Sequence, residues 1–200
     1  VDVDAPVSRY VREYPFTGTT VLQLISHSNG LPPYYEFWDP WFASDEVRTT
    51  KQMLDIVARE LPGPAFEPGT RFEYSNFGFD VAALLIERVS GRSIAQFLDE
   101  RFFSRFGMEA SFARPGRFAD WPGVRTMGYR WRDGGWQVVD VFDREAFIGG
   151  SNVYFSVADL SRWASANARG PAIAPGAFAA GQRHPPIGGQ LSPLTSLSWY

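Results

Sequence analysis

The chain has 200 residues, of which 44% are hydrophobic and 16% aromatic, enough for one domain with an ordered core, so disorder is excluded. Its 19 basic and 22 acidic residues nearly balance, with a net charge of -3, which argues against a nucleic-acid partner. The chain has no cysteine and no clustered histidines, so we expect no metal and no other cofactor. No apolar run comes near the ~20 residues that span a bilayer, so we expect no membrane association for this section.

Capping boxes predict the first two helices. Thr20 with Gln23 opens a short helix that runs to about Ser28. Thr49 with Gln52 opens a second helix, which Pro-Gly-Pro ends. The apolar residues of the second helix fall on one face: Met53, Ile56, Val57 and Leu61.

Between these two helices the sequence is aromatic and irregular, over residues 34–44. The run from Tyr34 to Trp41 predicts a loop held by its own aromatic side chains. The alternative is a sugar-stacking platform or one wall of an acyl pocket.

A pair of helices with a short joint is predicted from about Phe77. The first ends at Gly91, a typical left-handed terminator, and Ser93 with Gln96 caps the second. The first helix carries one apolar stripe: Val81, Leu84, Leu85 and Val89. The second directs apolar residues inward: Ile94, Phe97, Leu98 and Phe102.

The last predicted elements are a β-hairpin and one more helix. Between Met127 and Val141 the period changes to two, and Asp133-Gly134-Gly135 is typical of a hairpin turn. A helix then opens at Ser156, with Leu160 and Trp163 expected on its buried side. The whole chain, 1–200, is thus expected to be one partial, mostly helical α+β domain, cut at both ends from a larger fold.

Tyr74 and Asn76 are the predicted catalytic residues. They stand one residue apart where an extended segment meets a helix start, so their polar tips point toward the same side. With Asn76 as the helix cap, the first-turn amides and the positive end of the helix dipole would favour a phenolate. The alternative is that Asn76 is only a cap and Tyr74 only a core aromatic residue.

The sequence does not complete this site. For a tyrosine to act as a base near neutrality, its pKa must fall from about 10 by roughly 3 units, or about 4 kcal/mol. A helix terminus supplies at most ~2 kcal/mol, so a nearby lysine ammonium would have to supply the rest. The chain has a single lysine, Lys51, and nothing in the sequence brings it to Tyr74.

Four blocks carry a family resemblance, and they follow one another in the family's order. They are Asp4 to Val11, Val21 to Pro32, Pro68 to Gly91, and Gly149 to Leu160. In these blocks the chain resembles the class C β-lactamases, D-Ala-D-Ala carboxypeptidases and β-lactamase-like esterases. The resemblance implies an α+β section of a β-lactamase/transpeptidase-like fold, mainly its helical region plus a β-hairpin.

The resemblance also implies a chemistry. The serine of a Ser-x-x-Lys motif attacks a β-lactam, D-amino-acid peptide or ester carbonyl, and water releases the resulting acyl-enzyme. Tyr74-Ser75-Asn76 would face that serine, with Tyr74 as proton shuttle and Asn76 as donor to the substrate's amide or to the lysine. The expected partner is a small-molecule or peptide substrate, and the expected setting is bacterial, periplasmic or secreted.

The sequence departs from the family pattern at two motifs. Neither Ser-x-x-Lys nor a Lys-Thr-Gly or His-x-Gly strand occurs in these 200 residues, and the family places the first upstream and the second downstream. We therefore expect the full-length protein to be the enzyme and this section alone to be inactive. The alternative is a non-catalytic β-lactamase-like scaffold or peptide-binding protein.

Other polar residues give weaker hypotheses. Ser28 half matches a nucleophile elbow but stands at a helix end, where that motif does not belong. His27 is expected to be a buried or helix-end residue that holds the following loop. Two of the carboxylates Asp39, Asp45 and Glu73 could be imagined as a glycosidase pair, but nothing in the sequence sets a separation between them.

Overall fold

The computed structural model describes residues 1–32, 49–114, 126–138, 148–168, 186–187 and 190–191. Its helices are η1 (Val7–Arg9), α1 (Val21–Ile25), α3 (Thr50–Glu60), α4 (Asn76–Ser90), α5 (Ile94–Leu98), the π-helical η3 (Asp99–Phe103), η4 (Ser104–Phe106) and α6 (Val157–Ala168). Its strands are β1 (Phe112–Ala113), β2 (Tyr129–Arg132), β3 (Gly135–Val138), β4 (Val153–Tyr154), β5 (Pro186–Ile187) and β6 (Gln190–Leu191). The strands pair antiparallel as β1-β4, β2-β3 and β5-β6.

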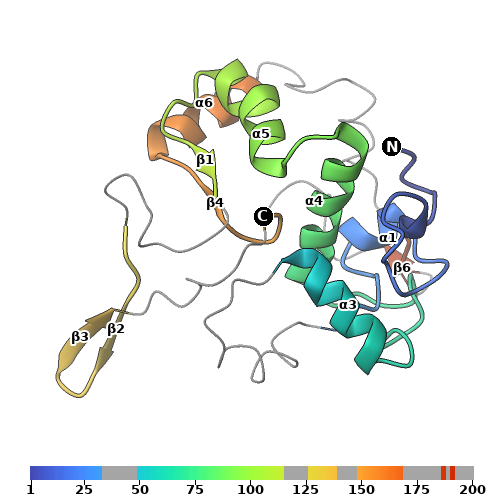
Figure 1. The fold of residues 1–200 in the computed structure, drawn as a ribbon. Coiled ribbons are helices and arrows are strands. Elements are labelled where there is room, and N and C mark those ends of the chain that lie inside the picture. Colours follow the sequence, from blue (N-terminus) through green and yellow to red (C-terminus); the bar gives the residue numbers. More distant parts are fainter. Residues whose placement is uncertain (33–48, 115–125, 139–147, 169–185, 188–189, 192–200) are drawn as a thin grey trace.

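Helix α4 contributes to two apolar clusters. It runs between α5 on one side and α1 and α3 on the other (Figure 1). On one side Phe77, Val81 and Leu85 pack with the N-terminal segment, α1 and α3. On another side Ala83 joins Ile148 and the α5 region in a smaller cluster. Because α4 contributes to both clusters, the position of its first turn is set from two directions.

The predicted capping boxes are present at all three helix starts. In α1, α3 and α5 the cap hydroxyl accepts from the backbone of the N3 glutamine, whose side chain accepts from the cap N–H. Gly91 ends α4 in the left-handed region, with φ at 69°. Helix α1 is shorter than predicted and ends at Ile25, because the backbone of His27 turns out of the helix at a φ of 55°.

Two residues predicted to be inward are exposed. Val89 follows the buried Leu85 by four residues on the same face of α4 but is 53% exposed, because it lies in the last turn of the helix. Leu160 is 51% exposed, since α6 turns Asp159 and Trp163 inward and Leu160 follows 100° further round. In both helices, packing against the neighbouring elements determined which apolar residues are buried.

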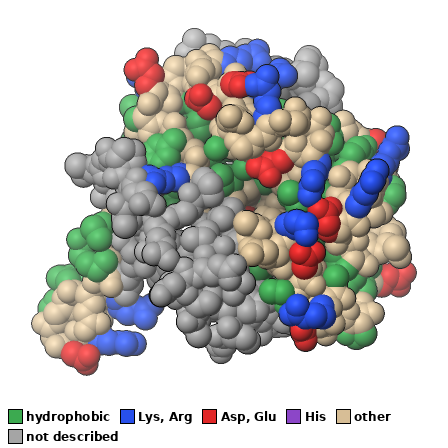
Figure 2. Space-filling model, viewed as in Figure 1, with side chains coloured by type: hydrophobic (Ala, Val, Ile, Leu, Met, Phe, Trp, Pro, Cys, Tyr) green, Lys and Arg blue, Asp and Glu red, His purple; other side chains and the backbone are tan. Residues whose placement is uncertain are grey.

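The predicted hairpin is confirmed and projects from the rest of the chain (Figure 1). Asp133 and Gly134 both have positive φ, at 54° and 77°, as a type I′ turn requires. Figure 2 shows hydrophobic and basic side chains on this projecting hairpin, where Trp131 and Trp136 are exposed. The aromatic run from Tyr34 to Trp41 lies outside the described residues.

Among the helices of the described residues, none has the length and apolar character needed to cross a membrane.

Candidate functional site

Tyr74 presents its hydroxyl at the surface directly before α4. Its side chain is 55% exposed, and the hydroxyl donates to Asn76 Oδ1 at 2.8 Å. The ring rests on the imidazole of His27, with the two ring centres 4.6 Å apart. Tyr74 is therefore not the core aromatic residue of the alternative interpretation.

Asn76 is the first residue of α4 and not its cap, so this part of the prediction was wrong. The cap position belongs to Ser75, which is extended with φ at -145° and makes no side-chain cap hydrogen bond. The Asn76 amide oxygen accepts from the phenol instead of from a backbone N–H. Tyr74 and Asn76 are thus joined directly, at the end of the helix whose dipole is positive.

His27 is the buried helix-end residue that the sequence predicted. Its side chain is 4% exposed, and its Nδ1 accepts from the Ser75 N–H at 3.1 Å. Ser28 next to it is 1% exposed, and its Oγ lies 3.0 Å from Ser26 Oγ. A nucleophile elbow presents its serine to the substrate, so the buried Ser28 does not fit that role.

The remaining polar candidates do not join this site. Lys51 pairs with Asp55 at 2.8 Å on the outer surface of α3, and Glu73 pairs with Arg71 at 2.7 Å. Asp39 and Asp45 lie outside the described residues, so the glycosidase pair is untested. Within the described ranges, no cluster of three metal-ligating side chains occurs.

A glycine pair packs against the first turns of α4. The Gly150 N–H donates to Asp80 Oδ1 at 2.9 Å. A Cβ on Gly150 would lie 2.6 Å from Asn76 Cβ, and one on Gly149 would lie 2.3 Å from the Phe79 carbonyl oxygen. The loop can approach Asn76 this closely only because both residues lack a side chain.

Asp80 is a buried acid that the sequence prediction missed. It follows Asn76 by four residues, so it lies on the same face of α4, and it is 1% exposed. Burial raises the pKa of Asp80 to about 7, although the Gly150 N–H bond acts in the opposite direction. Two features of the sequence could have indicated this buried acid. One is its place within the apolar pattern of the helix, and the other is the glycine pair Gly149-Gly150 later in the chain.

Gly150→Ala is expected to destabilise the protein by about 1–3 kcal/mol, because the added methyl group overlaps Asn76. Thermal unfolding of the full-length protein measures this effect. The matched control is Gly135→Ala on the hairpin, where a Cβ meets no atom within 4 Å. Equal unfolding temperatures for the two variants would contradict the tight packing of the glycine pair against α4.

The sequence profile of the Beta-lactamase family matches residues 1–196. The chain therefore belongs to the Beta-lactamase family. It is 31% identical over 102 residues to penicillin-binding protein 4* of Bacillus subtilis (strain 168), covering 51% of this chain and 23% of that protein. It is 28% identical over 109 residues to D-aminopeptidase of Brucella anthropi, covering 54% of this chain and 21% of that protein. The matched part of the chain thus spans less than a quarter of the length of these curated relatives.

Solved structures agree on the fold. The penicillin-binding protein of Bacillus halodurans superposes with a TM-score of 0.76 at 24% identity, over 96% of this chain and 64% of that one. The D-stereospecific amidohydrolase of Streptomyces sp. superposes with a TM-score of 0.73 at 22% identity, over 94% and 63%. The predicted β-lactamase/transpeptidase-like fold is confirmed.

Proposed function

We propose that this chain supplies the Tyr-x-Asn part of a serine hydrolase site, whose acyl-enzyme forms on a serine of a Ser-x-x-Lys motif absent from these 200 residues. Membership in the Beta-lactamase family and the names of the two curated relatives support a hydrolase of this kind. The observation that carries the proposal is the exposed Tyr74 hydroxyl, bonded to Asn76 at the start of α4.

In the proposed reaction Tyr74 moves the proton. As the serine attacks the carbonyl, the phenolate oxygen of Tyr74 accepts the hydroxyl proton and later delivers it to the leaving group. The phenolate needs a neighbouring cation, for which we propose the lysine of the same Ser-x-x-Lys motif. Lys51 does not serve, since it pairs with Asp55 on α3.

Asn76 is proposed as a hydrogen-bond donor to the substrate. An amide side chain has one acceptor oxygen and one NH₂ group with two donors. While Tyr74 is protonated, its hydroxyl donates to Asn76 Oδ1, which leaves the NH₂ group as the end suited to a substrate carbonyl. The amide thereby couples the position of the proton shuttle to the position of the substrate.

The proposed substrates are acyl compounds with a β-lactam, a D-amino-acid amide or peptide, or a small ester. The Brucella anthropi relative is named a D-aminopeptidase, and the Bacillus subtilis relative a penicillin-binding protein. All three substrate classes present a carbonyl that a serine can attack to give an acyl-enzyme. The proposed activities therefore include those of a carboxypeptidase, an amidase and an esterase.

Labelling of the full-length protein tests this proposal. We expect a fluorescent penicillin or a fluorescent fluorophosphonate to form a covalent adduct that survives denaturing electrophoresis. Peptide mass spectrometry should place the adduct on a serine followed three residues later by lysine. The absence of labelling by both probes would reject the hydrolase and leave the non-catalytic scaffold.

A further inference from the structure

Three consecutive residues, Glu73 to Ser75, contact a single residue, His27, through its backbone and its side chain. The Glu73 N–H donates to the His27 carbonyl oxygen at 2.8 Å, and the Ser75 N–H donates to His27 Nδ1 at 3.1 Å. Between these two bonds, the Tyr74 ring lies over the imidazole at a centre-to-centre distance of 4.6 Å and a tilt of 34°. The segment that carries Tyr74 is therefore held to His27 at three successive positions.

The imidazole itself is closely surrounded. His27 is 4% exposed, and two further rings pack on it: Phe72 edge-on at 5.6 Å and Phe79 at 5.1 Å. Phe79 belongs to α4, whereas Phe72 precedes the Tyr74 segment. With contacts from both sides, the ring cannot turn without moving either the helix or the segment.

The backbone of His27 has an unusual conformation that directs the ring to this place. Its φ of 55° lies in the left-handed region, which non-glycine residues seldom adopt. Such a conformation persists where the surrounding contacts hold it. Here it ends α1 and turns the imidazole toward the Tyr74 segment.

The protonation state of His27 suits a hydrogen-bond acceptor. A nitrogen that accepts a backbone N–H carries no proton, so the neutral ring holds its proton on Nε2. Burial lowers the pKa of His27, which keeps the ring neutral over a wider range of pH. The bond to Ser75 is therefore available under ordinary assay conditions.

We infer that His27 is a positioning residue for the hydrolase reaction: its Nδ1 holds the Ser75 N–H, and with it the backbone that joins Tyr74 to Asn76. This inference rests on the proposed function. His27 touches no reacting atom in this scheme and acts through Tyr74. A small displacement of a proton shuttle costs a large factor in rate, so loss of the Nδ1 acceptor should slow acylation by about 10-fold.

Three substitutions at His27 in the full-length protein test the inference. His27→Asn places an acceptor oxygen near the position of Nδ1, and asparagine tolerates a positive φ. His27→Gln places its acceptor further from the backbone, and His27→Phe keeps an aromatic ring without an acceptor. We expect the acylation rate to stay within about 3-fold of wild type for Asn and to fall about 10-fold for Gln and Phe. Equal rates for Asn and Gln would overturn the inference, even where His27→Phe does not fold.

A double-mutant cycle with Tyr74→Phe separates positioning from general destabilisation. If His27 acts chiefly through Tyr74, His27→Gln should cost about 10-fold in the wild-type background and less than about 3-fold in the Tyr74→Phe background, where only its effect on Asn76 remains. An equal loss in both backgrounds would overturn the inference and leave the proposed function intact. If Tyr74→Phe alone leaves acylation unchanged, the proposed function fails, and the inference fails with it.

Discussion

Tyr74→Phe is expected to slow acylation of the full-length protein on the order of 100-fold or more, the range that removal of a general acid–base group produces. The variant loses only the hydroxyl that donates to Asn76 and keeps the ring that rests on His27. Because the side chain is 55% exposed, the change should leave the unfolding temperature nearly unaltered. The measurement is the rate of covalent labelling by a fluorescent penicillin or fluorophosphonate.

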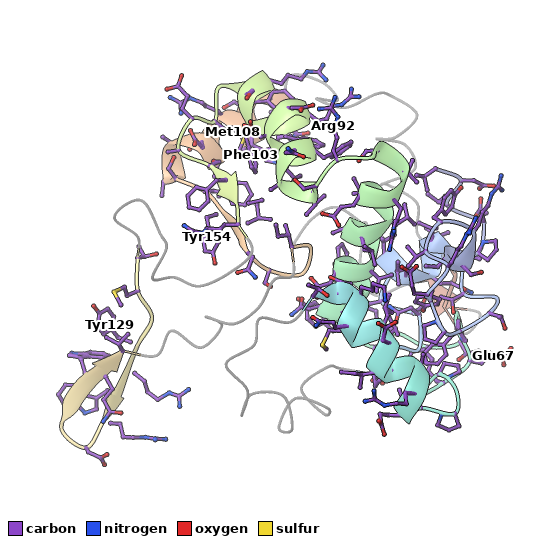
Figure 3. All side chains as sticks on the ribbon, in the orientation of Figure 1. Glu67, Arg92, Phe103, Met108, Tyr129 and Tyr154 are labelled. Carbon is purple, nitrogen blue, oxygen red and sulfur yellow. The ribbon has the colours of Figure 1, made fainter. Side chains whose placement is uncertain are left out.

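The matched control for this variant is Tyr129→Phe. Tyr129 is a similarly exposed phenol, at 56%, and lies on the hairpin well away from α4 (Figure 3). We expect its labelling rate to equal that of the wild type. Labelling that continues at the wild-type rate in the Tyr74→Phe protein would remove the proton-shuttle role from Tyr74.

Asp80→Asn is expected to abolish a pH dependence of stability that the wild type shows. Burial raises the pKa of Asp80 from 3.8 to about 7, so between these values the folded state binds more protons than the unfolded state. The free energy of unfolding therefore falls as the pH rises through this window. At about 1.4 kcal/mol per pKa unit, the wild type should lose up to roughly 3 kcal/mol between pH 5 and pH 8. Asparagine at this position can still accept the Gly150 N–H and does not ionise.

Asp159→Asn provides the control, because the pKa of Asp159 is shifted in the opposite direction to that of Asp80. Burial acts to raise the pKa of Asp159, but hydrogen bonds from Ser111, Ala110 and Arg162 outweigh it and hold the pKa below its usual value. Since that carboxylate is ionised at pH 5 and at pH 8, Asp159→Asn should lower stability similarly at both. Chemical unfolding at pH 5 and at pH 8 measures the free energy of unfolding of the wild type, Asp80→Asn and Asp159→Asn. Identical pH dependence in the wild type and Asp80→Asn would show that Asp80 does not titrate in this range.

Tyr74 and Asp80, the residues changed in the two main predictions, lie directly before and within the first turns of helix α4. Asn76 opens the helix beside Tyr74, and Asp80, one turn later, holds the Gly149-Gly150 loop against the same face. On its other side, Gly78 comes so close to α1 that a Cβ there would lie 2.9 Å from the Leu24 carbonyl oxygen. The start of α4 is therefore clamped between two parts of the chain, as a rigid site requires.

The sequence alone determined the elements whose cause is local. Capping boxes at Thr20, Thr49 and Ser93 and the left-handed Gly91 act within a few residues of themselves, so their positions could be read directly. The type I′ turn at Asp133-Gly134 is local in the same sense. The four family blocks likewise identified Tyr74 and Asn76 as the candidate pair and the fold that surrounds them.

Tertiary structure decided the features that depend on distant partners. Whether Asn76 would cap α4 or receive the Tyr74 hydroxyl depended on how the preceding segment was held, and His27, 48 residues away from Ser75, holds it. Asp80 became a buried acid because Gly150, 70 residues later, packs onto it. No periodicity encodes such contacts, since they arise only when separate segments exclude water from the same space.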